Sequence, residues 1–81
     1  MSRFYMHLRN RAGEMLDLEG TECFDRDALR KLVLLNARGL IAADVMGGVI
    51  DLSFRIDAED AAGALVHSLS FADAVKVMPG G

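Results

Sequence analysis

Asp25 to Ala43, DRDALRKLVLLNARGLIAA, is the stretch that decides the fold, because it is the only long segment with helical periodicity. Asp25 suits the N-cap position, where a carboxylate accepts hydrogen bonds from the free backbone N–H groups of the first turn. Asp27 places further negative charge at the positive end of the helix dipole. We therefore predict one long helix that begins at Asp25 and ends by Gly47-Gly48, a pair typical of a C-terminal stop.

The predicted helix has two apolar sides at a step of 100° per residue. The larger side is the expected core stripe. It contains Leu29, Leu32, Val33, Asn36, Leu40 and Ala43, with Leu35 and Gly39 at its edge. Gly39 costs about 1 kcal/mol against Ala in a helix, so it indicates either a strand passing close or a kink. Leu34, Ala37 and Ile41 remain on the other side, and they indicate either a contact with a partner, or plain exposure or cover by the C-terminal tail.

A first pair of strands precedes the helix. Alternating residues from Arg3 to Arg9 predict a half-buried strand, and the chain returns from Glu14 to Leu18 after a turn over Asn10 to Gly13. The inward residues of the first strand are expected to be Phe4, Met6 and Leu8. Its outward row is expected to contain Arg3, Tyr5, His7 and Arg9.

A second pair of strands follows the helix. Val49 to Ile56 is the clearest strand, and Ala64 to Phe71 returns after a polar loop over Asp57 to Gly63. The inward residues are expected to be Ile50, Leu52, Phe54 and Ile56, followed by Leu65, His67, Leu69 and Phe71. The outward residues are expected to be Asp51, Ser53 and Arg55, followed by Val66, Ser68 and Ser70.

This order of elements predicts an α+β domain of ββαββ type, in which one long helix packs on an antiparallel sheet formed by two hairpins. Short connections favour antiparallel pairing within each hairpin, whereas the strand order does not follow from the pattern. With 81 residues, one domain is the natural expectation. We expect it to span residues 1–78, with residues 79–81 as a frayed tail.

The composition favours a protein that associates with itself. Hydrophobic residues make up 52% of the chain, slightly above the average for a soluble domain. A domain of this size buries only about 60–65% of the surface that its unfolded chain exposes, so some apolar surface must stay outside or meet a partner. The net charge of −3 argues against nonspecific binding to nucleic acid or to an anionic membrane, since both need a basic field.

The sequence also favours a cytoplasmic location. A single cysteine excludes an intrachain disulfide and suits a reducing compartment. The first ten residues, MSRFYMHLRN, contain no apolar segment of the kind found in signal peptides. The longest apolar run, Leu32 to Leu35, is far shorter than the roughly 20 residues of a transmembrane helix.

The outward row of the first strand is the clearest candidate for a binding site. Tyr5 and His7 lie between Arg3 and Arg9, an arrangement that suits an anion or nucleotide platform. The same residue types suit a polar sheet face or half of a dimer interface, where Tyr and Arg are favoured. We favour the second interpretation.

The remaining candidates predict no catalytic, cofactor or metal site. His67 falls on an apolar strand, which indicates a core-edge residue rather than a ligand. Cys23 indicates a small packed side chain, because no histidine has a spacing that would activate it as a nucleophile. The acidic loop residues lack the Gly and the terminal Glu of a calcium loop; they are Asp57, Glu59 and Asp60.

Three motifs resemble those of a family of short bacterial proteins that is uncharacterised. They are RFYMHLR from Arg3 to Arg9, DLEG from Asp17 to Gly20 and LSFADA from Leu69 to Ala74. That family joins an Arg-aromatic-His-Leu-Arg opening to an acidic Gly turn, an Ala/Leu/Arg-rich helix and a closing Phe-Ala-Asp-Ala. This sequence departs from it at Met6, where an aromatic is usual, and in a longer loop over residues 57–63. The resemblance implies a ββαββ-type domain and carries no catalytic residue across.

The sequence contains no information about a substrate. We expect a non-enzymatic interaction domain that acts as a homodimer or other homo-oligomer, or as an adaptor for another protein. Its interface residues are predicted to be Leu34, Ala37, Ile41, Tyr5 and His7. One alternative is a regulatory nucleic-acid-binding module that uses the row Arg3, Tyr5, His7, Arg9 and Arg55. A second alternative is a small enzyme or ligand-binding protein that uses His7 and Tyr5.

Overall fold

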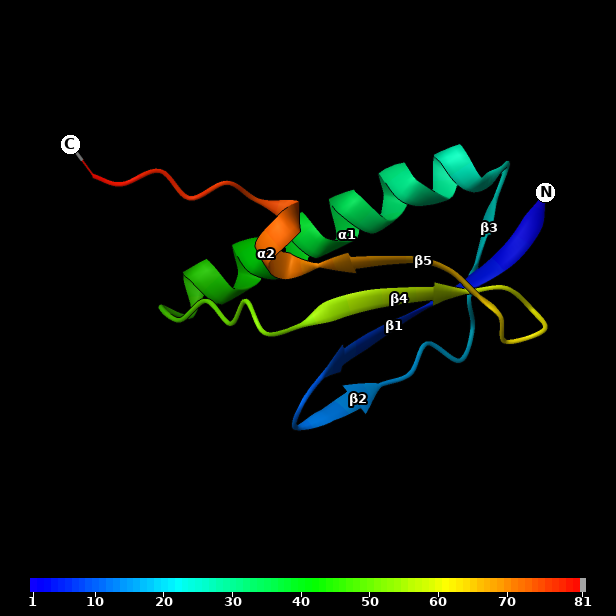
Figure 1. Cartoon of the computed structure of the whole chain (residues 1–81), viewed down its shortest axis with the longest axis horizontal. Coiled ribbons are helices and arrows are strands. Elements are labelled where there is room, and N and C mark those ends of the chain that lie inside the picture. The colour runs from blue at the N-terminus through cyan, green and yellow to red at the C-terminus, as the bar shows by residue number, and fades with distance from the viewer. Residues whose placement is uncertain (81) are drawn as a thin grey trace.

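The computed structural model describes residues 1–80 and has one long helix on an antiparallel sheet, so the predicted α+β fold is confirmed. Its elements are shown in Figure 1 and are β1 (Ser2–Asn10), β2 (Gly13–Met15), β3 (Thr21–Cys23), α1 (Arg26–Met46), β4 (Arg55–Glu59), β5 (Leu65–Ser70) and α2 (Phe71–Ala74). The strand order is β2-β1-β4-β5, and β3 also pairs with β1. Within residues 1–80, neither helix is long and apolar enough to cross a membrane. The predicted frayed tail ends at Gly81, which lies outside the described residues.

The long helix begins and ends as its local sequence predicts. The side chain of Asp25 accepts a hydrogen bond of 2.8 Å from the Ala28 N–H, which confirms the N-cap. At the other end the Gly47 N–H donates to the carbonyl oxygens of Ala43 and Asp44. The helix therefore runs three residues beyond Ala43 and stops at Gly47-Gly48, where Gly48 has a positive φ of 86°.

The first hairpin is interrupted after three residues of its second strand. β2 pairs Met15 with Leu8, and β3 resumes where Thr21 pairs with Phe4. Five residues, 16–20, thus lie opposite three residues of β1. Asp17 accounts for the interruption, because its carboxylate accepts hydrogen bonds from the backbone N–H groups of Met6, Glu19 and Gly20. The predicted strand over residues 14–18 was wrong beyond Met15, and β3 was not predicted.

The strand after the helix lies later in the chain than predicted. Residues 49–54 are irregular, because the Asp51 carboxylate accepts from the Ser53 N–H and hydroxyl and forms a local turn. β4 begins at Arg55, so the alternation continues through the segment that was predicted to be a loop. Its apolar residues Ile56 and Ala58 are buried, and the connection to β5 shortens to residues 60–64.

A β-bulge changes the orientation of residues at the start of β5. Ala58 pairs with His67, whereas Glu59 pairs with Leu65, so Val66 is the extra residue. Val66 therefore packs against the core and Leu65 is exposed, the reverse of the prediction. Beyond the bulge the predicted register is correct: Leu69 packs against the core and Phe71 is buried.

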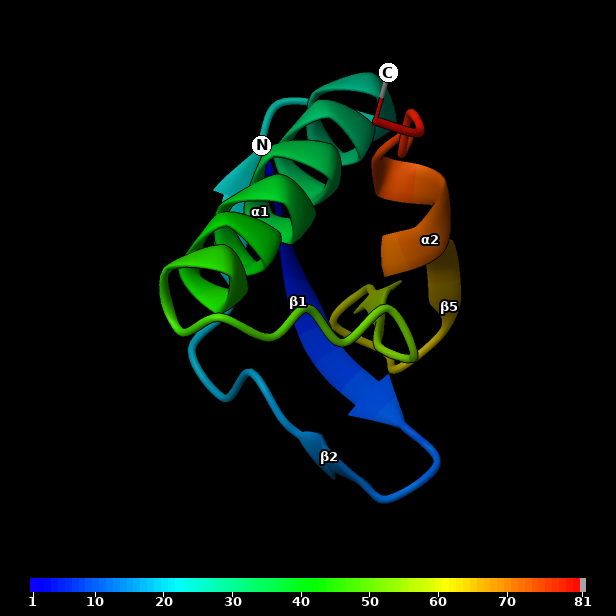
Figure 2. The same cartoon turned by 90° about the vertical axis from the view of Figure 1, so that its left-hand side faces the viewer.

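The helix is rotated relative to the predicted core stripe. Its buried residues are Leu29, Val33, Ala37 and Ile41. Ala37 is 0% and Ile41 is 6% exposed, and the half-buried Leu34 packs against the same core. Leu34, Ala37 and Ile41 are therefore not an exposed interface, and of the alternatives given for them the structure fits cover by the C-terminal segment. The physical reason is α2, which lies beside α1 in Figure 2 and is bonded to it where Arg38 Nε donates to the Ala74 carbonyl at 2.9 Å.

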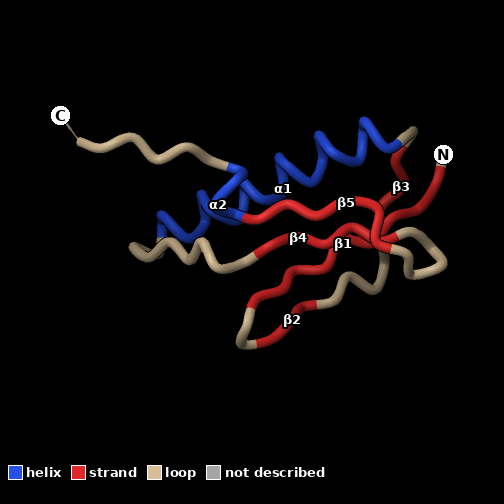
Figure 3. Tube along the Cα trace, in the orientation of Figure 1, coloured by secondary structure: helices blue, strands red, loops and turns tan. Residues whose placement is uncertain are grey.

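The rotation leaves the other side of α1 uncovered. Leu40, which was predicted to face the core, is 42% exposed, and Leu35, which was predicted at the edge of the core stripe, is 64% exposed. Gly39 is not explained by a passing strand, because no atom of another element within residues 1–80 lies within 4 Å of a Cβ built there. Figure 3 shows the sheet below α1, with the β1–β2 hairpin extending away from the helix.

Candidate functional site

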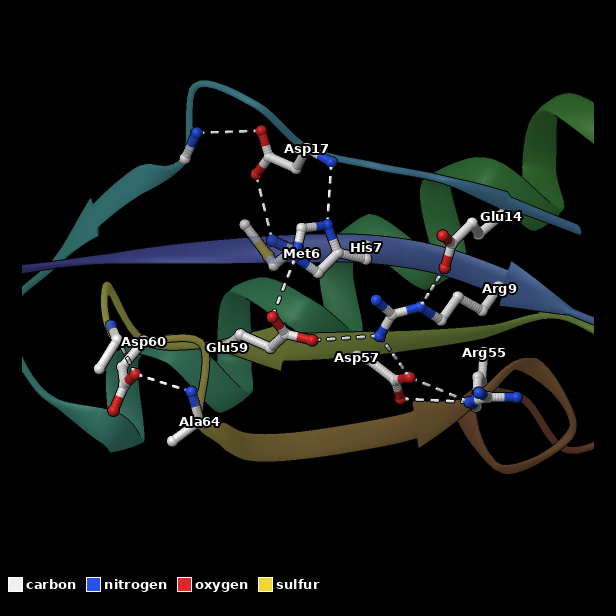
Figure 4. A network of polar contacts seen from close by, with 12 residues as sticks. Met6, His7, Arg9, Glu14, Asp17, Arg55, Asp57, Glu59, Asp60 and Ala64 are labelled. Atoms are coloured by element: carbon white, nitrogen blue, oxygen red, sulfur yellow. Dashed lines mark hydrogen bonds and ion pairs between the residues drawn. The ribbon is translucent and has the colours of Figure 1, made fainter.

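The sheet face directed away from α1 carries a polar network, shown in Figure 4. β1 and β4 pair so that Tyr5 lies opposite Glu59, His7 opposite Asp57, and Arg9 opposite Arg55. Because directly paired residues share one face of an antiparallel sheet, their side chains meet there. The predicted outward row is thus confirmed as a row, but it shares its face with acidic residues that were predicted to be in a loop.

Arg9 is the centre of this network. Its Nε donates to Glu14 at 2.8 Å, and one terminal nitrogen donates to Asp57 at 3.0 Å and to Glu59 at 3.2 Å. These hydrogen bonds, the one to Glu14 first, raise the pKa of Arg9 above its ordinary value. The guanidinium is therefore matched by three carboxylates of its own chain.

Asp57 is the buried acid of the network. Burial opposes its ionisation, but hydrogen bonds from Ser68, Arg9 and Arg55 outweigh this effect and hold the pKa of Asp57 below its usual range. The Ser68 hydroxyl donates at 2.7 Å, and Arg55 Nε donates at 3.1 Å. The fold thus stabilises Asp57 in its charged form. Its hydrogen-bond donors lie on the two neighbouring strands and on its own strand.

His7 is only 8% exposed and both of its ring nitrogens have partners. Nδ1 accepts from the Asp17 N–H at 3.0 Å, and Nε2 lies 3.4 Å from Glu59 Oε1. Because Nδ1 accepts, the ring proton of the neutral imidazole belongs on Nε2, facing Glu59. His7 therefore anchors the 16–20 loop to the sheet and offers no free nitrogen to a ligand or a substrate.

The flanking members of the row are also engaged within the chain. Arg3 donates to the Glu19 carbonyl at 2.8 Å and lies 3.7 Å from the Glu22 carboxylate. Tyr5 is half-buried beside Gly20, where φ is +72° and an added Cβ would lie 2.8 Å from the Tyr5 ring. The row, for which an anion platform was the less favoured interpretation, is thus neutralised and packed by its own neighbours.

A shallow polar depression lies at the end of the β1–β2 hairpin. It has a volume of about 640 Å³ and is lined by the turn from Asn10 to Gly13 and by Arg9, Glu14 and Arg55. Arg9 is bonded to Glu14 and Arg55 to Asp57, so among residues 1–80 only Arg11 adds positive charge to this depression outside an ion pair.

The remaining candidates behave as packed residues. Cys23 is buried in the core, and His67 is half-buried opposite Ala58. Among residues 1–80, no group of three His, Cys, Asp or Glu side chains is placed to hold a metal ion. In the same part of the chain, no buried side-chain nitrogen or oxygen lacks a hydrogen-bond partner.

An apolar groove lies on the opposite face of the sheet, between α1 and the β1–β2 hairpin. It has a volume of about 370 Å³ and is lined by Met6, Leu8, Leu35, Asn36, Gly39, Leu40 and Ile56. Beside it, Met15 on β2 is 70% exposed. Figures 1 and 2 show why: β2 lies on the far side of β1 from the helix, so α1 does not cover this corner.

Two sets of site residues were missed by the sequence analysis, each for a definite reason. Asp57 and Glu59 were assigned to a loop, although they continue the polar alternation of β4 beside the buried Ile56 and Ala58. The groove was missed because both sides of α1 are apolar. Helical periodicity then does not decide which of the two sides faces the sheet.

Comparison with known proteins identifies a family and no function. A family model described as "Domain of unknown function (DUF6894)" matches residues 3–72. No curated protein and no solved structure matches the chain. The match covers most of the chain and fits the resemblance to an uncharacterised family.

Proposed function

We propose that this chain, which belongs to the DUF6894 family, is a non-enzymatic protein-interaction domain that works as a homo-oligomer, in the simplest case a homodimer. The observation that carries the proposal is the apolar groove between α1 and β1, whose walls include the exposed Leu35 and Leu40. An adaptor that binds a different protein through the same groove is the alternative within this class.

The physical argument rests on the cost of removing each face from water. Covering the groove buries apolar surface, which is favourable by about 25 cal/mol per Å². Covering the polar face would bury Arg9, Asp57 and Glu59, whose hydrogen bonds are already made within the chain, so a partner could add few new ones. The groove is therefore the surface where association gains most.

The nucleic-acid alternative and the ligand-binding alternative both depend on the row of β1. A phosphate needs unmatched positive charge, whereas Arg9 contacts three carboxylates and Arg3 contacts Glu22. A ligand at His7 and Tyr5 needs an accessible ring nitrogen, and both nitrogens of His7 are engaged. No contact on this face favours either alternative over association.

The proposal includes a bacterial origin and a cytoplasmic location. The first follows from the resemblance of the RFYMHLR and LSFADA motifs to short bacterial proteins. The second follows from the single cysteine, which suits a reducing compartment.

Size-exclusion chromatography coupled to light scattering tests the proposal. We expect a mass of two chains, or a higher multiple, at tens of micromolar protein. A mass of one chain at that concentration would overturn self-association. Binding to an oligonucleotide that weakens steeply with salt would instead support the nucleic-acid module.

A further inference from the structure

We propose that a second copy of this chain covers the rim of the groove formed by Leu35 and Gly39, packing its own α1 antiparallel across the first α1 at Gly39. This inference rests on the proposed self-association and names its surface and geometry. Four features of α1 and of the molecular surface carry it.

The first feature is Gly39, which has no explanation within the chain. A glycine inside a helix costs about 1 kcal/mol against Ala. Apart from its chain neighbours and the adjacent helix backbone, no atom of residues 1–80 lies within 4 Å of the position where a Cβ would stand, and the backbone there has no positive φ. The missing side chain instead lowers the wall of the groove and lets another helix approach closely.

The second feature is the stripe of residues that surrounds Gly39, which we call the outer stripe. At 100° per residue it lies opposite the buried side of α1. It consists of the exposed residues Lys31, Leu35, Gly39, Ala42 and Met46. A stripe of this width, with one charge at its end, matches the seam between two antiparallel helices.

The third feature is charge. α1 has Asp27 in its first turn and no basic residue in its last turn, so its negative end is uncompensated within the helix. Lys31 lies eight residues before Gly39, and Gly47 lies eight residues after it, which is about 12 Å along the axis in each direction. A two-fold axis at Gly39 therefore brings Lys31 of each copy to the C-terminal end of the other helix. Within its own chain, Lys31 makes only an exposed contact of 3.9 Å with Asp27.

The fourth feature is the surface area, which distinguishes a second copy from a short peptide. The chain exposes 5634 Å², whereas a folded monomer of its size exposes roughly 4,800 Å². The excess of about 850 Å² is close to the surface that each partner buries in a standard protein–protein interface. Part of it belongs to the tail after Ala74, where Val77 is also exposed, so the test includes that residue.

Sedimentation equilibrium of three variants tests the proposal, each with one leucine or valine replaced by aspartate. Leu35→Asp changes the outer stripe, and we expect it to raise the dissociation constant by at least about 30-fold, as for a central interface residue. Leu18→Asp is the matched control, because Leu18 is an exposed leucine on the 16–20 loop and does not line the groove. Val77→Asp reports on the tail. Circular dichroism and the unfolding midpoint verify that each variant is folded.

The outcomes separate this inference from the proposed function. A wild-type chain that stays monomeric overturns both. A dimer that Leu35→Asp weakens no more than Leu18→Asp leaves self-association in place and overturns the assignment to α1. A dimer that only Val77→Asp weakens assigns the contact to the tail and also overturns it.

Disulfide cross-linking tests the antiparallel register. A disulfide needs a Cα separation of about 4.4–6.8 Å. The proposed two-fold axis brings the two Gly39 Cα atoms to such a distance. Gly39→Cys should therefore form a covalent dimer under mild oxidation. The native Cys23 is buried and does not compete. Arg30→Cys, at an exposed position outside the outer stripe, is the control, and equal cross-linking of the two variants would overturn the register.

Discussion

The two faces of the sheet differ in how fully contacts within one chain pair their polar side chains or cover their apolar ones. On the face away from α1, Arg9, Asp57 and Glu59 bond to one another across β1 and β4. On the face toward α1, the helix covers only part of the sheet and leaves Leu35 and Met15 exposed beside a groove. The comparison teaches that strand alternation assigns a residue to a face, whereas only the packed structure determines whether that face is complete within one chain.

The largest expected effect is a difference in the free energy of unfolding between variants on the two sides of α1. Ile41→Ala removes a side chain that is buried in the core, and we expect it to lower the free energy of unfolding by about 2–5 kcal/mol. Leu35→Ala, at an exposed position on the same helix, should change it by about 0.5 kcal/mol or less. Urea unfolding of dilute protein measures both. Equal losses would contradict the observed rotation of the helix.

A smaller effect is expected on the polar face. Asp57→Asn keeps the shape of the side chain but removes the charge that faces Arg9 and Arg55 and leaves their bonds weakened. We expect a loss of about 1–3 kcal/mol in the free energy of unfolding. Glu14→Gln is the control, because its pair with Arg9 is exposed and should contribute about 1 kcal/mol or less.

Asp57→Asn also tests which face of the sheet mediates association. If association uses the groove, folded Asp57→Asn should keep the oligomeric state of the wild type. Loss of association with the fold intact, measured by light scattering, would indicate that the polar face is the interface.

The smallest expected effect is the response of the polar face to acid. The pKa values of Asp57 and Asp17 are both lowered in the folded chain; burial opposes this, but hydrogen bonds outweigh it. The unfolded chain then binds protons at a higher pH than the folded chain, so this stabilisation is complete above the ordinary pKa of about 3.9 and is lost as the pH falls through the folded values. Urea unfolding between about pH 3 and pH 7 should therefore show a decline at the acid end. Asp57→Asn should reduce its slope, and an unchanged slope would contradict the role of Asp57.

Local chemistry made several features predictable. The Asp25 cap, the stop at Gly47-Gly48 and the alternation of β1 depend on residues close in the sequence, and all were found as expected. The acidic turn from Asp17 to Gly20 was also visible. Its consequence was not, because the Asp17 carboxylate reaches Met6, eleven residues earlier in the chain.

The sequence by itself determined which segments are helical or extended in outline, because caps, turns and periodicity act within a few residues. Tertiary structure decided the rotation of α1 and the bulge at Val66. In both cases the apolar pattern allowed two arrangements, and packing against residues distant in the sequence selected one of them. The docking of α2 against Arg38 buried Ile41 and left Leu35 outside. That selection, which no local pattern contains, left Leu40 of the expected core stripe, and Leu35 at its edge, to line the groove.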